Sequence, residues 1–262
     1  MAIDLAQEKW SGQINVTKIG ATSSEGGTRK KTICVGGQKS LAYLFKEGDI
    51  PYAPVIAQEI WDTEPDDWPD VLREPFKDVL SNPLLWAEKA VKEYEVDLIC
   101  LKLQGASPEG KNKSPQDLAS LAKKLLQKVD VPLIILGCGD DQKDNLVMPV
   151  VSNALKNERC LLGSAVQDNY KTLVASCLAD GHNIIAESPI DINIAKQLNI
   201  LITDMCLPAE RIVINPTVGA LGYGLEYAYS IMERARLASL NGDKMLSMPF
   251  VCFVGQEVWR VK

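Results

Sequence analysis

Seven short apolar runs recur along the chain, and amphipathic helical segments lie between them. The runs cover residues 54–60, 97–103, 132–137, 160–165, 183–188, 211–216 and 250–255. Continuous apolar runs of this length, bounded by turn residues, are typical of strands buried on both faces of a parallel sheet. Strands that alternate with helices along a chain predict an α/β fold. We therefore predict a (β/α)8 TIM barrel, with a doubly wound open sheet as the alternative.

The segments between the runs carry helix start signals. They cover residues 83–94, 114–128, 142–157, 168–180, 190–206 and 224–240. Pro83 and Pro115 stand in the first turn of two of these segments, after candidate caps: Ser81 or Asn82 before the first and Ser114 before the second. Apolar residues at helical spacing in most of these segments predict that each helix buries one face.

The region before the first run has a different pattern. It contains two short β-like runs, 13–20 and 31–36, separated by a polar segment with two glycines. Residues 1–50 are therefore predicted to be an N-terminal β-hairpin extension that covers one barrel end, and residues 51–262 the TIM barrel domain. After the seventh run the chain offers only EVWRVK, which starts a helix. We expect the last β/α elements to be missing from this sequence, so that the barrel domain is C-terminally incomplete.

Charge and composition exclude several classes of function. The net charge of −6, with both signs scattered, argues against nucleic-acid binding, which needs a basic face. No apolar run approaches the ~20 residues of a membrane span, and the N-terminus lacks the apolar core of a secretory signal. We therefore expect a cytoplasmic protein with no membrane partner. The seven cysteines include no C-x-x-C pair, so we expect them to be reduced and this chain to bind no iron–sulfur cluster.

Polar residues and glycines stand where the predicted strands end, and this end of a parallel barrel carries its working groups. We predict that these residues bind a cofactor: Glu59, Asp62, Lys102, Gln104, Gly139, Asp140, Glu187, Ser188, Asn215, Thr217, Gly219 and Gln256. The only histidine, His182, precedes its strand and so lies at the opposite barrel end. We therefore expect neither a histidine-based triad nor a histidine metal site, and we predict no catalytic residue.

Three of these features also have plain structural interpretations. Lys102 has the chemistry to form a Schiff base, but a buried ion pair with a carboxylate such as Glu59 is the simpler explanation. The glycines of 219–224 precede a helix and either cradle an anion or serve only the backbone conformation. The long acidic segment 61–82 predicts a solvated loop, a docking face or a hard-cation site built from Asp62, Asp66, Asp67 and Asp70.

Several long strings carry a resemblance that spans essentially the whole chain. They are EGGTRKKTICVGG, DWPDVLREPF, LKLQGASPEG, HNIIAESPIDINIAKQLNILITDM, INPTVGALGYGLEYAYSIMERAR and NGDKMLSMP. In these strings the chain resembles the small (delta) subunit of the corrinoid iron–sulfur protein of the acetyl-CoA synthase/carbon monoxide dehydrogenase system. The resemblance implies a TIM barrel similar to that of pterin-dependent methyltransferases.

The resemblance also implies a function. Members of that family belong to a heterodimeric methyl carrier of the anaerobic Wood–Ljungdahl pathway of carbon fixation and acetyl-CoA biosynthesis. The large subunit holds the iron–sulfur cluster and binds cobalamin, which the small subunit caps without catalysis of its own. The implied partners are the large subunit, a methyltetrahydrofolate-dependent methyltransferase and acetyl-CoA synthase.

Two other functions stay open. In a pterin-dependent methyltransferase acting on a corrinoid protein, the Asn215 amide would hydrogen-bond the pterin, and Glu59, Asp140 or Glu187 would bind its aminopyrimidine edge. In a barrel lyase or aldolase, Lys102 would form a Schiff base with a carbonyl substrate.

Overall fold

The computed structural model describes residues 6–220, 222 and 224–255. At its centre a parallel sheet of six strands follows the sequence order. The strands are β3 (Ala57–Trp61), β4 (Leu98–Lys102), β5 (Leu133–Leu136), β6 (Leu161–Ala165), β7 (Asn183–Glu187) and β8 (Ile212–Asn215). The predicted α/β fold of the TIM-barrel type is confirmed, and all six carboxyl ends lie at one edge of the sheet.

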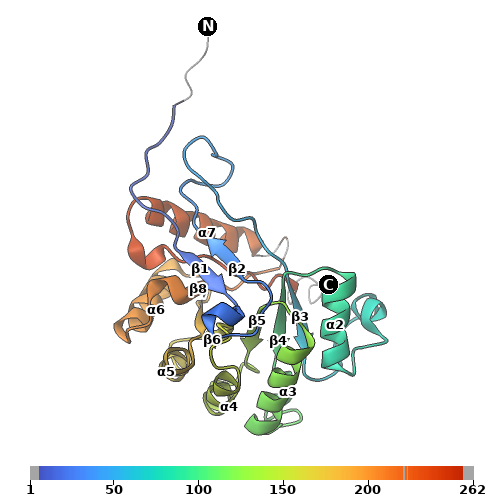
Figure 1. The fold of residues 1–262 in the computed structure, drawn as a ribbon. Coiled ribbons are helices and arrows are strands. Elements are labelled where there is room, and N and C mark those ends of the chain that lie inside the picture. Colours follow the sequence, from blue (N-terminus) through green and yellow to red (C-terminus); the bar gives the residue numbers. More distant parts are fainter. Residues whose placement is uncertain (1–5, 221, 223, 256–262) are drawn as a thin grey trace.

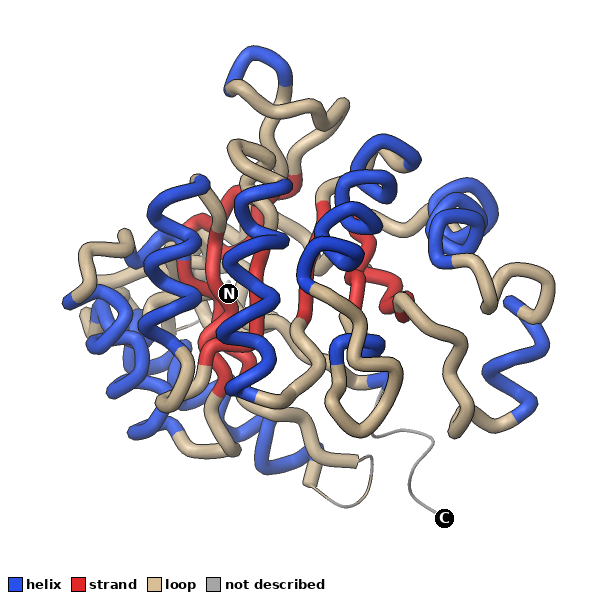
Figure 2. Tube along the Cα trace, turned by 90° about the horizontal axis from the view of Figure 1, so that it is seen from below, coloured by secondary structure: helices blue, strands red, loops and turns tan. Residues whose placement is uncertain are grey.

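Helices cover the outside of these strands, as Figures 1 and 2 show. The longer ones are α2 (Pro83–Glu93), α3 (Pro115–Lys128), α4 (Asp141–Ala154), α5 (Tyr170–Asp180), α6 (Ile192–Asp204) and α7 (Leu225–Leu240). Short helices lie in the connections: α1 (Asp70–Arg73), η1 (Ser23–Glu25), η2 (Glu74–Phe76), η3 (Gln104–Ala106), η4 (Ala209–Arg211) and η5 (Lys244–Leu246). None of the helices in the described ranges is both long and apolar enough to cross a membrane.

The predicted caps hold the first turns of two helices. The side-chain oxygen of Asn82 accepts hydrogen bonds from the backbone N–H groups of Leu84 and Leu85 at 3.1 and 3.3 Å. The Ser114 hydroxyl accepts one from Asp117 N at 3.1 Å. These bonds satisfy amide groups that have no partner within the helix, which is why the two helices begin at Pro83 and Pro115.

Alternate residues of each strand face two different cores, because strand side chains alternate between faces. Outward residues such as Ile99, Leu101 and Ile135 pack against the helices. Inward residues pack against one another inside the barrel: Leu98, Cys100, Ile134, Leu136, Leu161, Ile185 and Val213. The inward residue nearest the carboxyl end of each strand therefore faces the barrel mouth.

The predicted N-terminal hairpin is present and closes the opposite end of the barrel. Strands β1 (Val16–Ile19) and β2 (Ile33–Gly36) pair in antiparallel fashion. Asn183, which begins β7, donates a side-chain hydrogen bond to the carbonyl of Lys18 at 2.8 Å, and Ile19 packs with the inward residues of the barrel. The hairpin thus covers the amino ends of the strands (Figure 1). The division into domains at residue 50 stays a prediction.

The predicted seventh strand, 250–255, is wrong as a strand. Phe250 forms a single parallel bridge with Ile214, supported by Ile214 N donating to Pro249 O at 2.8 Å and Val251 N donating to Ile214 O at 2.9 Å. A ladder of hydrogen bonds does not continue from this bridge, so the described barrel has six strands and is not closed by hydrogen bonds. The predicted helix start after Gly255, with Gln256, lies outside the described residues.

The acidic segment 61–82 is an ordered surface rather than a bare loop. It contains α1 and η2, and its Trp68 ring packs edge-on between Trp61 and Trp86, at centroid distances of 5.8 and 5.6 Å. Aromatic pairs at such distances stabilise the packing beyond the area that they bury. Trp68 therefore attaches this segment to Trp86 on α2 and to Trp61 at the end of β3.

Candidate functional site

A cavity of about 250 Å³ lies at the carboxyl ends of the strands, where the working groups of a parallel barrel are expected. We call it the top pocket. It brings together five of the twelve predicted site residues: Lys102, Gly139, Glu187, Asn215 and Thr217. It also contains residues outside the predicted set, among them Cys138, Asp141, Asp144 and Ser164. The role of the predicted residues in cofactor binding stays a prediction, but their shared position is a property of the fold.

Glu187 and Asn215 form the centre of the pocket wall. They are register partners at the ends of β7 and β8. The Asn215 amide nitrogen donates to the Glu187 carboxylate at 3.0 Å, and its oxygen accepts from Thr217 N at 3.1 Å. Because both ends of the Asn215 amide are engaged, its orientation is fixed. The Glu187 carboxylate still has lone pairs for a ligand, because a carboxylate accepts several hydrogen bonds.

Ser188 and Thr217 hold β7 against β8 just beyond the strands. The Thr217 hydroxyl donates to Ser188 O at 2.8 Å, and Ser188 N donates to the Asn215 carbonyl at 3.0 Å. Ser188 is fully buried, and its hydroxyl has no hydrogen-bond partner in the described part of the chain. It does not line the top pocket, so the geometry gives it a place in the wall behind the pocket.

Lys102 is the one cation among the described residues that line the top pocket. Its ammonium lies over the Trp61 ring, 5.1 Å from the centroid, and Trp61 is its register partner on β3. Among the described residues Lys102 makes no ion pair, so the predicted pairing with Glu59 is not formed. The Glu59 carboxylate instead accepts a hydrogen bond from Trp61 Nε1 at 2.6 Å.

The loop after β5 is folded around a buried carboxylate. Asp144 accepts hydrogen bonds from Cys138 N at 2.8 Å and Gly139 N at 3.0 Å. Gly137 leaves it room, since a Cβ there would lie 2.2 Å from an Asp144 oxygen. Burial raises the pKa of the Asp144 carboxyl, and burial raises the pKa of the Cys138 thiol to about 11. Cys138 is therefore a protonated thiol at neutral pH, and a nucleophilic role for it is disfavoured.

Asp144 was not predicted, and the only signal for it in the sequence is its spacing from Asp140. It lies four residues after Asp140, in the first turn of α4, where the positive end of the helix dipole stabilises a carboxylate. Asp140, which was predicted to bind a cofactor, caps this helix by accepting from Lys143 N at 2.8 Å. The Gly137–Asp140 segment thus forms a tight turn whose backbone N–H groups converge on Asp144.

Several predicted residues lie elsewhere. Asp62 is buried and accepts hydrogen bonds from Gly105 N at 2.7 Å and Lys113 Nζ at 2.9 Å, which ties the loop after β3 to the loop after β4. Gln104 belongs to η3 in the second of these loops. The Gly219 backbone packs against Gly224, where a Cβ would meet it at 2.9 Å, which favours the conformational interpretation of these glycines. Lys113, which completes the Asp62 link, was missed because nothing local marks it.

The described residues contain no group of three or more histidine, cysteine or carboxylate side chains arranged to hold a metal ion. His182 is fully buried at the amino end of β7, as predicted, and hydrogen-bonds Cys160 N and Ser152 O at 3.1 and 3.0 Å. Burial lowers the pKa of its imidazole. In the acidic segment, Glu64 pairs with Arg73 at 2.6 Å rather than joining a carboxylate cluster.

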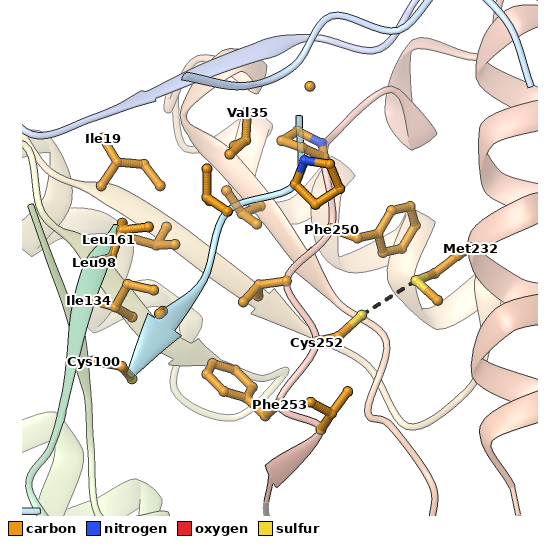
Figure 3. A pocket seen from close by; sticks show the side chains of 18 of the residues that line it. Ile19, Val35, Leu98, Cys100, Ile134, Leu161, Met232, Phe250, Cys252 and Phe253 are labelled. Atoms are coloured by element: carbon orange, nitrogen blue, oxygen red, sulfur yellow. Dashed lines mark hydrogen bonds between the residues drawn. The ribbon is translucent and has the colours of Figure 1, made fainter. Parts of the chain in front are cut away.

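A second, larger cavity of about 890 Å³ occupies the barrel interior. We call it the lumen cavity. Its walls are mostly apolar, and the side chains of Leu98, Cys100, Ile134, Leu161 and Phe253 surround it in Figure 3. Glu59, a predicted site residue, lines this cavity and not the top pocket. Phe253 lines both cavities and so stands between the apolar interior and the polar mouth.

Comparison with known proteins identifies relatives of this chain. The family described as CO dehydrogenase/acetyl-CoA synthase delta subunit matches residues 18–256. The acetyl-CoA decarbonylase/synthase complex subunit delta of Methanocaldococcus jannaschii is 40% identical over 243 residues, which are 92% of this chain and 59% of that protein. The corresponding subunit of Methanothermobacter thermautotrophicus is 39% identical over 241 residues, 92% of this chain and 60% of that protein. The chain therefore spans less than two thirds of the length of these relatives.

A solved structure from Toxoplasma gondii, assigned as a deoxyribose-phosphate aldolase, superposes with a TM-score of 0.45. The sequence identity is 12%, and the match covers 74% of this chain and 87% of that chain.

Proposed function

Since the chain belongs to the CO dehydrogenase/acetyl-CoA synthase delta subunit family, we propose that it covers a corrinoid held by a large partner subunit. The printed names of the relatives assign them to an acetyl-CoA decarbonylase/synthase complex. In our proposal this chain belongs to such a complex and has no catalysis of its own. It docks a methyltetrahydrofolate-dependent methyltransferase and acetyl-CoA synthase during methyl transfer, and the iron–sulfur cluster resides on the large subunit.

The observation that carries the proposal is the ring of inward polar groups at the barrel mouth. Lys102, Glu187 and Asn215 end three strands and face one pocket. A corrin ring carries carboxamides around its edge, and carboxamides need both acceptors and donors. The Glu187 carboxylate supplies an acceptor and the Lys102 ammonium a donor. These residues fit the group.

Other features of the pocket also suit a large flat ligand. A Cβ built on Gly139 would have no other atom within 4 Å, so the backbone there is open to close approach. When bound, the corrinoid supplies a cobalt that carries the methyl group. This chain orients the ring and limits the access of water, and its only histidine is buried at the other barrel end.

A pterin-dependent methyltransferase is the second candidate. The adjacent Glu187 carboxylate and Asn215 amide are the kind of pair that recognises a pterin. However, one N–H and one oxygen lone pair of the Asn215 amide are already hydrogen-bonded within the chain, so only one donor and one acceptor position remain for a bound pterin. We therefore rank this function second. A Schiff base on Lys102 has no supporting carbonyl-binding group that we can identify in the described residues, so the lyase is third.

The proposal is tested by reconstitution with cobalamin. The isolated chain, the purified large subunit and their mixture are each incubated with cobalamin and separated by gel filtration, with the visible spectrum of the corrinoid as readout. We expect tight heterodimer formation, and cobalamin retention only in the pair. Retention by neither the pair nor the large subunit would contradict the proposal. Methyl transfer from methyltetrahydrofolate to free cobalamin by the isolated chain would instead support the second candidate.

A matched pair of variants locates the site. Glu187→Ala removes the acceptor of the top pocket, whereas Glu210→Ala removes an exposed carboxylate in η4, which precedes β8. We expect Glu187→Ala to weaken cobalamin retention by the pair about tenfold, the effect of losing a hydrogen bond to a charged group, and Glu210→Ala to leave it unchanged. Equal retention by both variants would remove the top pocket from the proposal. Borohydride trapping with carbonyl substrates tests the lyase, and trapping lost in Lys102→Met would revive it.

A further inference from the structure

The top pocket is too small to enclose a corrin ring. Its volume is about 250 Å³, which is the space of roughly eight water molecules at ~30 Å³ each. Pockets that enclose a drug-sized ligand measure about 300–1,000 Å³, and a corrin with its side arms is larger than such a ligand. The lining runs from the buried Leu136 and Asn215 to the exposed Gly139 at the mouth. A ring at this mouth therefore stays outside, and only a group that projects from its edge enters.

A hydrogen-bond acceptor and a donor lie side by side on the wall formed by the ends of β7 and β8. One oxygen of the Glu187 carboxylate accepts from the Asn215 amide nitrogen at 3.0 Å. The other oxygen, Oε1, accepts no hydrogen bond from the described part of the chain, and the second N–H of Asn215 has no partner there either. A primary carboxamide carries a carbonyl and an NH2 group, so it complements both. A carboxylate only accepts hydrogen bonds, so it complements the donor alone.

The charges of the lining favour a neutral group over an anion. Among the described lining residues there are three carboxyl groups, those of Asp141, Asp144 and Glu187, and a single ammonium, that of Lys102. The Asp144 carboxyl accepts from two backbone N–H groups, and the Asp141 carboxyl accepts from Asn169 Nδ2 at 3.1 Å, so the fold holds both in the wall. A ligand carboxylate in this pocket would therefore meet an excess of negative charge, whereas a carboxamide would not.

We propose that the top pocket receives a single carboxamide arm of the corrinoid and rejects an arm that is still a carboxylate. This inference rests on the proposed function, because it takes the corrinoid as the ligand. The arm's NH2 group donates to Glu187, its carbonyl accepts from Asn215, and its methylene part packs against the buried Leu136 and Val218 of the lining. The chain thus selects a fully amidated corrinoid, so the reaction that amidates the corrin carboxylates must be complete before the ring reaches it.

Glu187 and Lys102 act in opposite directions on this selection. A carboxylate arm beside Glu187 would leave the acceptor without a donor and add like-charge repulsion, and both effects weaken binding. The Lys102 ammonium attracts a carboxylate and so reduces the discrimination. Removing the charge of Glu187 should therefore relax the preference for the amide, and removing the charge of Lys102 should sharpen it. A pocket that only encloses the arm by shape would show neither effect.

Corrinoid analogues test the proposal. The isomeric monocarboxylic acids of cobalamin, each with one carboxamide arm hydrolysed, are compared with cobalamin for retention by the pair of subunits, with gel filtration and the visible spectrum as readout. We expect one isomer to be retained about tenfold less tightly than cobalamin. Equal retention of all isomers, or the same loss for every isomer, would overturn the single-arm pocket and leave the proposed function intact. If the pair did not retain cobalamin itself, the proposed function would fail, and this inference with it.

Three variants place the effect in the top pocket. Glu187→Gln keeps an acceptor but removes the charge, so it should weaken cobalamin a few-fold, strengthen the rejected isomer and bring their ratio close to one. Lys102→Gln should raise the ratio above that of the native pair. Glu210→Gln, which changes an exposed carboxylate outside the pocket, should leave the ratio at about tenfold. A ratio that Glu187→Gln does not lower would overturn the proposal. Binding of tetrahydrofolate to the isolated chain that Glu187→Gln abolishes would give the pocket to a pterin, which would overturn it too.

Discussion

At the scale of single residues, His182 shows what burial does to the chain's only histidine. The ring is fully buried, accepts a hydrogen bond from Cys160 N and faces Ser152 O, an environment that suits the neutral imidazole. Burial lowers the pKa of His182 in the folded state below its ordinary value. The unfolded chain therefore binds a proton more readily than the folded chain as the pH falls below about 6.5.

This linkage predicts a pH-dependent stability. The contribution of His182 is present above about pH 6.5 and is lost progressively as the pH falls toward the lowered folded-state pKa. Between pH 7.5 and 5.5 we expect the native chain to lose on the order of 1 kcal/mol more unfolding free energy than His182→Gln. Urea unfolding at the two pH values measures this difference. Parallel pH profiles of the two proteins would show that His182 does not control it.

Arg29 is a second residue whose role follows from burial. Its guanidinium is 5% exposed, donates to the carbonyls of Leu126 and Val129, and pairs with Glu158 at 3.4 Å. Arg29→Met leaves a buried Glu158 and unpaired carbonyls, so we expect the unfolding free energy to fall by about 3–5 kcal/mol. The neighbouring Lys30 pairs with Asp130 at the surface, and Lys30→Met should cost less than about 1 kcal/mol. Urea denaturation compares them, and similar losses would be inconsistent with a buried network.

At the scale of elements, Asp62 links two loops of the barrel mouth. It was expected to bind a cofactor, but its carboxylate accepts from Gly105 N and Lys113 Nζ and has no exposed surface. We expect Asp62→Ala to lower the unfolding free energy by about 2–4 kcal/mol, because it leaves the buried Gly105 amide without a partner and removes the ion pair with Lys113, whose ammonium keeps only the Asp62 carbonyl. A double-mutant cycle with Lys113→Met should give a coupling of about 1–3 kcal/mol. If Asp62→Ala kept its stability but lost cobalamin retention, Asp62 would act in cofactor binding and not in linking the loops.

At the scale of the whole molecule, the N-terminal hairpin and the barrel depend on one another. Ile19 in β1 is 3% exposed and packs with the inward barrel residues, whereas Val16 in the same strand is 37% exposed. Ile19→Ala should therefore lower the unfolding free energy of the entire chain by about 2–5 kcal/mol, and Val16→Ala by much less. Thermal denaturation followed at both near- and far-ultraviolet wavelengths checks this. Loss of the hairpin alone, with an unchanged barrel transition, would show that residues 1–50 fold as a separate unit.

The sequence predicted those parts of the site that depend on position within a strand. Glu187 and Asn215 end apolar runs, so their place at the barrel mouth followed from the strand pattern, and they are hydrogen-bonded in the structure. Asp144 was not predicted, although its partners, the Cys138 and Gly139 amides, are only six and five residues away. Lys113 was not predicted because its partner Asp62 lies on another loop, and no local spacing encodes that contact. Gly219 was predicted to bind a cofactor, but in the structure its close neighbour is the Gly224 backbone, five residues away.

By itself the sequence determined the order of strands and helices, the helix starts at Pro83 and Pro115, and the polar character of one barrel end. These properties are local: they depend on apolar periodicity, caps and the residue that follows each strand. The tertiary structure alone decided that 250–255 makes one bridge instead of a strand, that Asp62 joins two loops and does not line the top pocket, and that Arg236 lies beside the lumen cavity with no hydrogen-bond or ion-pair partner among the described residues. Each of these depends on which distant backbone edge or charge lies alongside, and hydrogen bonds and ion pairs form only when the fold brings those partners together.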